Sequence, residues 1–307
     1  MDTAVVDAYR ERLGRVGVWL GSRAIVSVTA AEERAAVAEI EELGYGSLWI
    51  GAGGMGKDEL THAAVLLAAA RRLVVATGIS PIWGREAFNT AGGAGLLADA
   101  YPGRFVLGLG VSHAPQVTAR GIDYHRPYRA MVTYLDRMDA AGYPGPPPAE
   151  PAPRVLAALR PRMLELARDR AEGAHPYFTP VEHTALAREV LGPGPLLVPE
   201  VAVMLETDPD TARAAARRYM ANPYLQLPNY LNNLREFGYT DDDFRDGGSD
   251  RLADAIVGWG DVDAVRARIE AHLAAGADHV VVQPIGAGLS GALAQLRELA
   301  PAVVRSV

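Results

Sequence analysis

A histidine that follows a glycine-ended apolar run is the first candidate for chemistry. The stretch is GRFVLGLGVSHAPQ, residues 103–116. In an extended strand Val106, Gly108 and Gly110 share one face, so the glycines clear space on that face near the strand's end. His113 lies just beyond, and imidazole titrates near neutral pH. The alternative is a tight turn followed by an exposed loop histidine.

A second stretch combines an aromatic ring with a cation. In VVATGISPIWGRE, residues 74–86, a β-branched run leaves through Gly78 and then meets Trp83 and Arg85. These types at a strand exit predict a pocket wall. A turn that carries a core tryptophan is the alternative.

A third stretch predicts an anion site. Arg160 and Pro161 open a helix after the run VLAAL, and a helix N-terminus offers unpaired N–H groups to an anion. The segment GAHPYFT closes the next apolar run with His175 and Tyr177. The alternative is that Arg160 is a solvated helix-start residue.

These three stretches need a scaffold that brings strand ends together. Short apolar runs alternate with amphipathic helical patterns, which predicts a parallel sheet. Eight such units favour a closed (β/α)₈ TIM barrel, whose sites lie at the carboxyl ends of the strands. An open doubly wound sheet of six or seven strands is the rival. The expected strands are 16–20, 47–50, 73–79, 105–110, 155–158, 174–176, 197–205 and 280–283.

Helix boundaries are marked by capping residues. Thr29 and Glu32 have capping-box spacing. Residues 179–182 repeat that spacing, with Pro180 expected at the first helical position. Asp208 and Asp261 are further expected helix starts. Residues 206–260 read as a helical insertion between strands seven and eight, so we expect one barrel domain over 1–307.

Composition excludes several function classes. The 307 residues carry a formal charge of −7, and the single lysine is Lys57, so no basic stripe suits nucleic acid. There is no cysteine, which is compatible with a reducing cytoplasm. We expect no membrane span, because no apolar run reaches the necessary length. The seven histidines show no metal-ligand spacing, so no metal is expected.

Taken together, the chain resembles the luciferase-like flavin and deazaflavin oxidoreductase superfamily, particularly its coenzyme F420-dependent branch. The residues that carry the resemblance are ELGYGSLWIG, GRFVLGLGVSH, RVLAALRPRMLELARDRAEGAH and GDVDAVRARIEAHLAAGADHVVVQ. The resemblance implies a (β/α)₈ barrel with extra helices between strands seven and eight. It also implies a deazaflavin ring across the barrel mouth and a cis peptide bond, here at Gly78–Ile79.

The resemblance further assigns site residues. It implies that cofactor contacts come from Trp19, Gly78, Ile79, Gly110, Val111, His113, Ala158, Leu159, Arg160, Gly173, Ala174 and His175, with Gln116 slightly further out. Trp83 and Tyr177 are expected in the substrate pocket. Asn229 and Tyr230 are further candidates on their place in the insertion alone, where a surface position is the alternative.

The chain departs from the family at one position. Some members carry an Asp–His pair after the second strand, and this sequence has Ala52 and Gly53 there. His113 is the candidate replacement as the catalytic proton-transfer residue. We therefore expect an F420-dependent oxidoreductase acting on a small organic substrate, as a cytoplasmic homodimer. The alternatives are an FMN-dependent monooxygenase and a cofactor-binding protein without catalysis.

Overall fold

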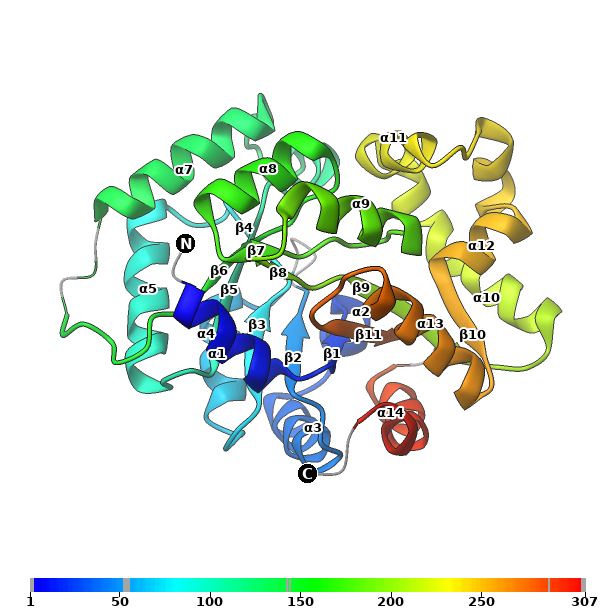
Figure 1. The fold of residues 1–307 in the computed structure, drawn as a ribbon, viewed down its shortest axis with the longest axis horizontal. Coiled ribbons are helices and arrows are strands. Elements are labelled where there is room, and N and C mark those ends of the chain that lie inside the picture. Colours follow the sequence, from blue (N-terminus) through cyan, green and yellow to red (C-terminus); the bar gives the residue numbers. More distant parts are fainter. Residues whose placement is uncertain (1–2, 52–55, 142, 144, 287, 305–307) are drawn as a thin grey trace.

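The computed structural model describes residues 3–51, 56–141, 143, 145–286 and 288–304. Parallel strands form a curled central sheet, and helices surround its outside (Figure 1). The strands are β1 (Val16–Leu20), β2 (Ser47–Ile50), β3 (Val74–Thr77), β4 (Ser80–Pro81), β5 (Phe105–Gly110), β6 (Arg154–Leu156), β7 (Gly173–Ala174), β8 (Leu196–Leu197), β9 (Glu200–Leu205), β10 (Val257–Gly260) and β11 (Val280–Pro284).

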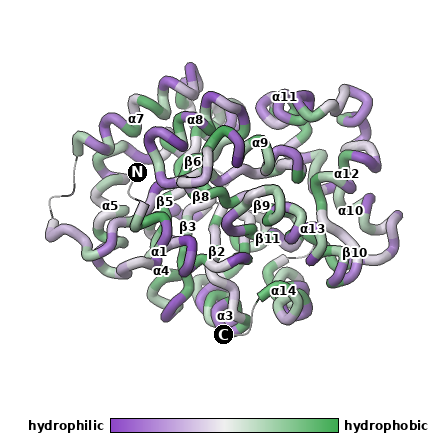
Figure 2. Tube along the Cα trace, viewed as in Figure 1, coloured by the Kyte–Doolittle hydropathy of each residue, from purple (hydrophilic) through white to green (hydrophobic). Residues whose placement is uncertain are grey.

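The helices connect these strands on the outside of the sheet. They are α1 (Thr3–Leu13), α2 (Ser22–Ile25), α3 (Ala30–Glu42), α4 (Glu59–Leu67), α5 (Ala87–Ala100), α6 (Ala114–Thr118), α7 (Pro127–Ala141), α8 (Pro161–Arg170), α9 (Val181–Leu191), α10 (Pro209–Ala221), η1 (Tyr224–Gln226), α11 (Pro228–Glu236), η2 (Asp241–Gly247), α12 (Asp250–Ile256), α13 (Val262–Ala274) and α14 (Leu289–Val303). Hydrophobic and hydrophilic residues alternate along α7, which has one face on the core (Figure 2). No helix in the described ranges is long and apolar enough to cross a bilayer.

Two consecutive strands, β8 and β9, together close the ring of strands. The sheet order is β10-β9-β11-β1-β2-β3-β5-β6-β7-β8, and β4 pairs with β5. Only Val198 and Pro199 separate β8 from β9. β8 pairs with β7, and β9 pairs with β11, so this interrupted strand completes the circuit. With β3 and β4 likewise sharing one position, the ring has the eight parallel positions that the sequence predicts, and β10 is an additional strand on β9.

The insertion differs from the expectation at its end. Residues 206–256 are helical or in loops, and Figure 1 shows α10, α11 and α12 gathered on one side of the sheet. Residues 257–260 form β10, a parallel strand on the free edge of β9. The sequence VGWG carries no strand pattern of its own, because two of its four residues are glycine. Pairing with β9 decides its conformation.

The side-chain alternation expected for β5 is confirmed. Phe105, Leu107 and Leu109 belong to the outer core between sheet and helices. Val106 belongs to the core inside the ring, together with the two tryptophans Trp19 and Trp49. At the amino-terminal end of the ring, α1 packs on this inner core, and the hydroxyl of Tyr9 donates to the Phe105 carbonyl at 3.0 Å. The inside of the barrel is therefore open only at its carboxyl end.

The capping predictions hold at three of four helices. Thr29 and Glu32 form a capping box, and Asp208 and Asp261 cap α10 and α13. The prediction at 179–182 is wrong: Pro180 is the N-cap of α9, and no side chain caps that end. A proline at the N-cap has no side-chain oxygen to offer, so the spacing of Thr179 and Glu182 has no consequence there.

Candidate active site

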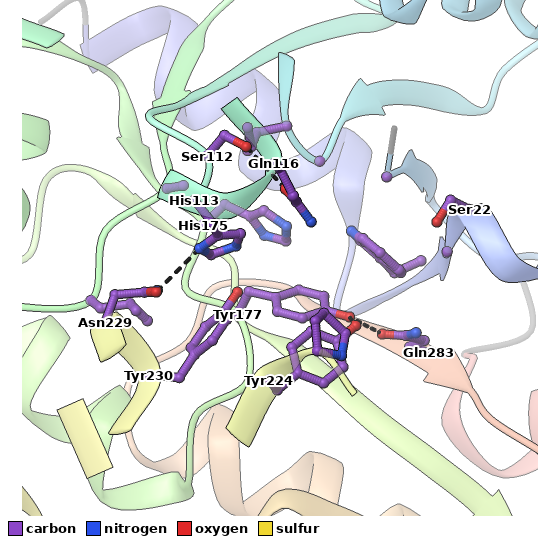
Figure 3. A pocket seen from close by; sticks show the side chains of 18 of the residues that line it. Ser22, Ser112, His113, Gln116, His175, Tyr177, Tyr224, Asn229, Tyr230 and Gln283 are labelled. Atoms are coloured by element: carbon purple, nitrogen blue, oxygen red, sulfur yellow. Dashed lines mark hydrogen bonds between the residues drawn. The ribbon is translucent and has the colours of Figure 1, made fainter. Parts of the chain in front are cut away.

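A deep cavity opens at the carboxyl ends of the strands. Its volume is about 1150 Å³. Side chains that line it come from strand ends and the loops beyond them, and from α10, η1 and α11 of the insertion. Figure 3 shows ring and amide side chains converging on this space from several elements. The barrel thus places a deep aromatic pocket where parallel barrels keep their sites.

Trp19 forms part of the floor of this cavity because three strand ends carry glycine. A Cβ on Gly51 would lie 2.3 Å from the indole, one on Gly78 2.5 Å, and one on Gly21 2.8 Å. None of these distances leaves room for a side chain. The indole therefore lies across the ends of β1, β2 and β3, and it is 6% exposed. Gly78, which the resemblance names as a cofactor contact, lines the cavity, but Trp19 fills the position where its Cβ would stand.

The predicted cis peptide bond is confirmed at Gly78–Ile79. Ile79 lines the cavity, whereas Gly110 does not. A Cβ on Gly110 would lie 2.5 Å from Ile79 Cδ1, so the missing side chain of Gly110 accommodates Ile79 rather than a ligand. The expectation that Gly110 opens the rim is therefore wrong in its detail. Ile79 and Trp19 instead form an apolar floor beneath the cavity.

His113, the candidate catalytic residue, lies on the cavity wall, where it can contact a bound substrate. Its Nδ1 is 3.2 Å from Oδ1 of Asn229 in α11, and its ring centroid is 5.3 Å from that of Tyr230. Burial lowers the pKa of His113 below its ordinary value, and the contact with Asn229 opposes that shift. The imidazole is consequently neutral at neutral pH.

Facing it is a cluster of tyrosine hydroxyls joined to Gln283. The Tyr177 hydroxyl donates to Gln283 Oε1 at 2.8 Å and lies 2.6 Å from the Tyr224 hydroxyl and 3.2 Å from that of Tyr219 (Figure 3). Burial raises the pKa of Tyr177 and Tyr219 well above 10, so both keep their protons. Two hydroxyls thus point at Gln283 Oε1, and the amide nitrogen of Gln283 lies on the side of Gly21, another residue of the cavity lining.

Two buried nitrogens at the floor have no hydrogen-bond partner within the described chain. One is Trp19 Nε1 and the other is His175 Nε2. His175 Nδ1 lies 2.7 Å from the Val198 carbonyl and so carries the hydrogen of the ring. Burial lowers the pKa of His175 to about 4, so this imidazole is neutral and structural at neutral pH.

Arginines line the mouth of the cavity. Arg160, Arg162 and Arg218 are exposed, and none forms an ion pair with another described residue. The guanidinium of Arg162 lies 4.5 Å from the Tyr128 ring centroid. Arg160 is the N-cap of α8, with Pro161 at its first position as the sequence predicts. Glu236 is the acidic side chain that shares this lining. The mouth thus suits an anionic group.

Most of the candidate residues named from sequence meet at this cavity. It is lined by Trp19, Gly78, Ile79, Val111, His113, Gln116, Ala158, Leu159, Arg160, His175, Tyr177, Asn229 and Tyr230. Gly110, Gly173, Ala174 and Trp83 do not line it.

The four residues outside the lining have other places in the fold. Gly173 and Ala174 form β7 within the barrel wall, where a Cβ on Gly173 would lie 2.4 Å from the Leu196 carbonyl oxygen. Trp83 is wrong as a pocket wall, because its indole N–H donates to the Val111 carbonyl at 2.7 Å from outside the cavity. Trp83 therefore supports the loop that carries His113. Ala52 and Gly53 lie outside the described residues.

Sequence reasoning missed Tyr219, Tyr224 and Gln283. Gln283 could have been found, because it is a polar residue at the carboxyl end of the apolar run VVVQ. Tyr219 lies on the buried face of α10, where an aromatic residue ordinarily reads as core. No local signal assigns it to the cavity.

A parallel barrel with a deep pocket at the carboxyl ends of its strands is a fold shared by many enzymes, and comparison with known proteins identifies the family. The family model described as luciferase-like monooxygenase matches residues 13–279. The chain belongs to this family, which confirms the resemblance to the luciferase-like superfamily. Family members are oxidoreductases and monooxygenases.

Solved structures share the fold at low sequence identity. An F420-dependent secondary alcohol dehydrogenase in complex with an F420–acetone adduct has a TM-score of 0.75 at 13% identity, over 95% of this chain and 99% of that chain. The coenzyme F420-dependent tetrahydromethanopterin reductase from Methanopyrus kandleri has 0.69 at 17%, over 94% and 99%.

A third similar structure was solved with a different cofactor. The oxygenating constituent of 3,6-diketocamphane monooxygenase from Pseudomonas putida, in complex with FMN, has a TM-score of 0.70 at 15% identity, over 94% of this chain and 97% of that chain. These likenesses confirm the predicted barrel fold. The comparison with curated proteins gave no match.

Proposed function

We propose that this protein is an oxidoreductase that transfers a hydride between coenzyme F420 and a small organic substrate. The observation that carries the proposal is the cavity itself, which joins a neutral His113 on its wall to unpaired arginines at its mouth. Its volume of about 1150 Å³ exceeds the ~300–1,000 Å³ typical of single-ligand pockets. There is room for a cofactor and a substrate together.

The residues present fit an anionic cofactor with a flat ring. Trp19 and Ile79 offer an apolar floor for the ring, and the amide nitrogen of Gln283 offers a donor for a polar ring edge. Arg160, at the start of α8, would hold the phosphate on the side chain of the cofactor. Arg162 and Arg218 add positive charge further along the mouth of the cavity. The guanidinium groups have no competing carboxylate within ion-pair distance in the described chain, so they are free to bind.

When bound, the deazaflavin would supply hydride acceptance or donation. The chain's own contribution is proton handling and water exclusion. His113 is neutral at neutral pH and can take a proton from substrate or return one. The tyrosine cluster covers the cavity from the side of the insertion, which shields the reacting groups from solvent.

Two alternative functions are each supported by a specific observation. The FMN-bound monooxygenase of similar fold supports an FMN-dependent reaction with O₂. The replacement of the family's Asp–His pair by Ala52 and Gly53 supports a cofactor-binding protein without catalysis. We favour the deazaflavin because the sequence resembles that branch.

Equilibrium binding to the cofactor-free protein tests the proposal. We expect F420 to bind at least about tenfold more tightly than FMN, measured by the change in cofactor fluorescence. Arg160→Ala should weaken F420 binding by about tenfold or more, since charged hydrogen bonds contribute about 1.5–3 kcal/mol. Arg34→Ala, an exposed arginine on α3 away from the cavity, is the matched control. Tight FMN binding without affinity for F420 would establish the first alternative, and bound F420 without turnover across a substrate screen the second.

We also propose that residues 1–307 act as one barrel domain in a cytoplasmic homodimer. Phe88 and Leu96 support the pairing, because both are large apolar side chains exposed on α5, at 55% and 58%. Absence of cysteine suits the reducing cytoplasm. Sedimentation velocity of wild type and Leu96→Glu tests the pairing, since a charge at that position should dissociate a dimer formed through α5.

A further inference from the structure

The contact between His113 and Asn229 joins two distant parts of the chain. His113 is the N-cap residue of α6, and Asn229 lies in the first turn of α11, 116 residues later. Figure 3 shows the Asn229 side chain directed at a histidine ring, with its oxygen toward the ring nitrogen. Nδ1 and Oδ1 are 3.2 Å apart.

This contact selects one of the two neutral forms of the imidazole. A carboxamide oxygen only accepts hydrogen bonds, so Nδ1 must carry the hydrogen, and Nε2 is then unprotonated. A histidine side chain free in water prefers the opposite form, with the hydrogen on Nε2. Asn229 therefore holds His113 in its less common tautomer.

The remaining nitrogen is available to a ligand. His113 lines the cavity. Its Nε2 has no hydrogen-bond partner among the described residues. This nitrogen is also not completely buried, so a ligand can reach it. An unprotonated Nε2 accepts a hydrogen bond or a proton from whatever binds there.

We propose that Asn229 is a positioning residue that fixes His113 as the Nδ1–H tautomer, so that Nε2 is the proton acceptor of the cavity. Its use in catalysis rests on the proposed function, but the tautomer does not. Oxidation of a carbinol carbon removes a hydride, which the proposed deazaflavin accepts, and the hydroxyl proton, which Nε2 accepts as the C=O bond forms. The tautomer therefore serves substrates that carry a hydroxyl on the carbon that is oxidised.

The surroundings of His113 keep it in the neutral state. Burial lowers its pKa, and the Asn229 contact is the other contribution, with none from a charged neighbour. The titratable ring that faces it is Tyr230, also from α11, whose pKa burial raises well above 10. No described residue forms an ion pair with His113, so the Asn229 amide determines which ring nitrogen carries the hydrogen.

Nitrogen NMR of the cofactor-free protein tests the tautomer directly. The His113 signals are assigned by their loss in His113→Gln. In wild type we expect Nδ1 to appear as a protonated nitrogen and Nε2 as an unprotonated one. In Asn229→Ala the ratio of the two tautomers should move toward Nε2–H by up to about tenfold, because one hydrogen bond is lost. Asn232→Ala, an exposed residue of the same helix, should leave the ratio unchanged.

Asn229→Asp gives a second, pH-dependent readout. A carboxylate keeps the hydrogen on Nδ1 and should raise the proton affinity of His113 by at least about tenfold. The titration curve, and the rising limb of kcat/KM against pH for a hydroxyl substrate, should both move to higher pH. A wild-type ring with the hydrogen on Nε2, or an Asn229→Ala ratio equal to that of Asn232→Ala, overturns the inference. A correct tautomer without F420 turnover would refute the proposed function alone.

Discussion

Glu200 offers the clearest test of how burial changes a pKa in this protein, because its carboxyl is buried next to the tyrosine cluster. It begins β9 and is 2% exposed. Oε2 accepts a hydrogen bond from the Phe178 backbone N–H at 3.2 Å, whereas Oε1 has no partner within the described chain. Burial raises the pKa of Glu200 to about 8, and the hydrogen bond from Phe178 opposes this. The carboxyl is therefore mostly protonated at pH 7.

The free energy of unfolding must then fall as pH rises. Between the ordinary glutamate value of 4.5 and about 8, the folded protein keeps a proton that the unfolded chain has lost. Linkage makes stability decrease with pH in that window, by about 1.4 kcal/mol per pH unit. The total is about 5 kcal/mol, lost by about pH 8 and constant above it. Glu200→Gln keeps the shape and removes the titration, so it should be increasingly stabilising relative to wild type across this window.

Urea unfolding of wild type and Glu200→Gln at pH 5, 6, 7 and 8 measures the effect. The difference between the two proteins should grow with pH, and Glu189→Gln, an exposed residue of α9, should show no such growth. Burial also lowers the pKa of His175 and His183 to about 4, but these residues are common to both proteins and cancel in the difference. A constant difference from pH 5 to pH 8 would mean that Glu200 is ionised in the folded state, and the reasoning would fail.

Two further changes test the cavity floor and the barrel closure. Gly78→Ala places a Cβ 2.5 Å from Trp19 Nε1, so we expect a loss of about 1–3 kcal/mol by thermal or urea unfolding and weaker cofactor binding. Gly92→Ala, where nothing lies within 4 Å, should lose neither. Asp278→Ala removes the acceptor of two arginine side chains and of the Leu197 backbone N–H, and should cost about 3 kcal/mol. Loss of less than about 1 kcal/mol would show that water replaces those contacts.

Local sequence determined the parts of this protein that depend on periodicity and caps. The alternation in β5 separates Val106 from Phe105 and Leu107 because successive residues of a strand point to opposite faces, whatever surrounds them. Thr29 caps α3 with atoms that lie within one turn of chain. The site's position followed as well, since parallel strands bring their carboxyl ends to one rim.

Contacts between distant segments decided the rest. Nothing in the sequence around Gly78 says that Trp19 fills its empty side, and nothing around Asn229 says that it meets His113. Residues 257–260 became a strand only because the edge of β9 was free. The sequence by itself therefore determined the barrel, the rim and several residues on it. Only the tertiary structure decided which groups touch, because a contact between residues far apart in the sequence leaves no local pattern in either partner.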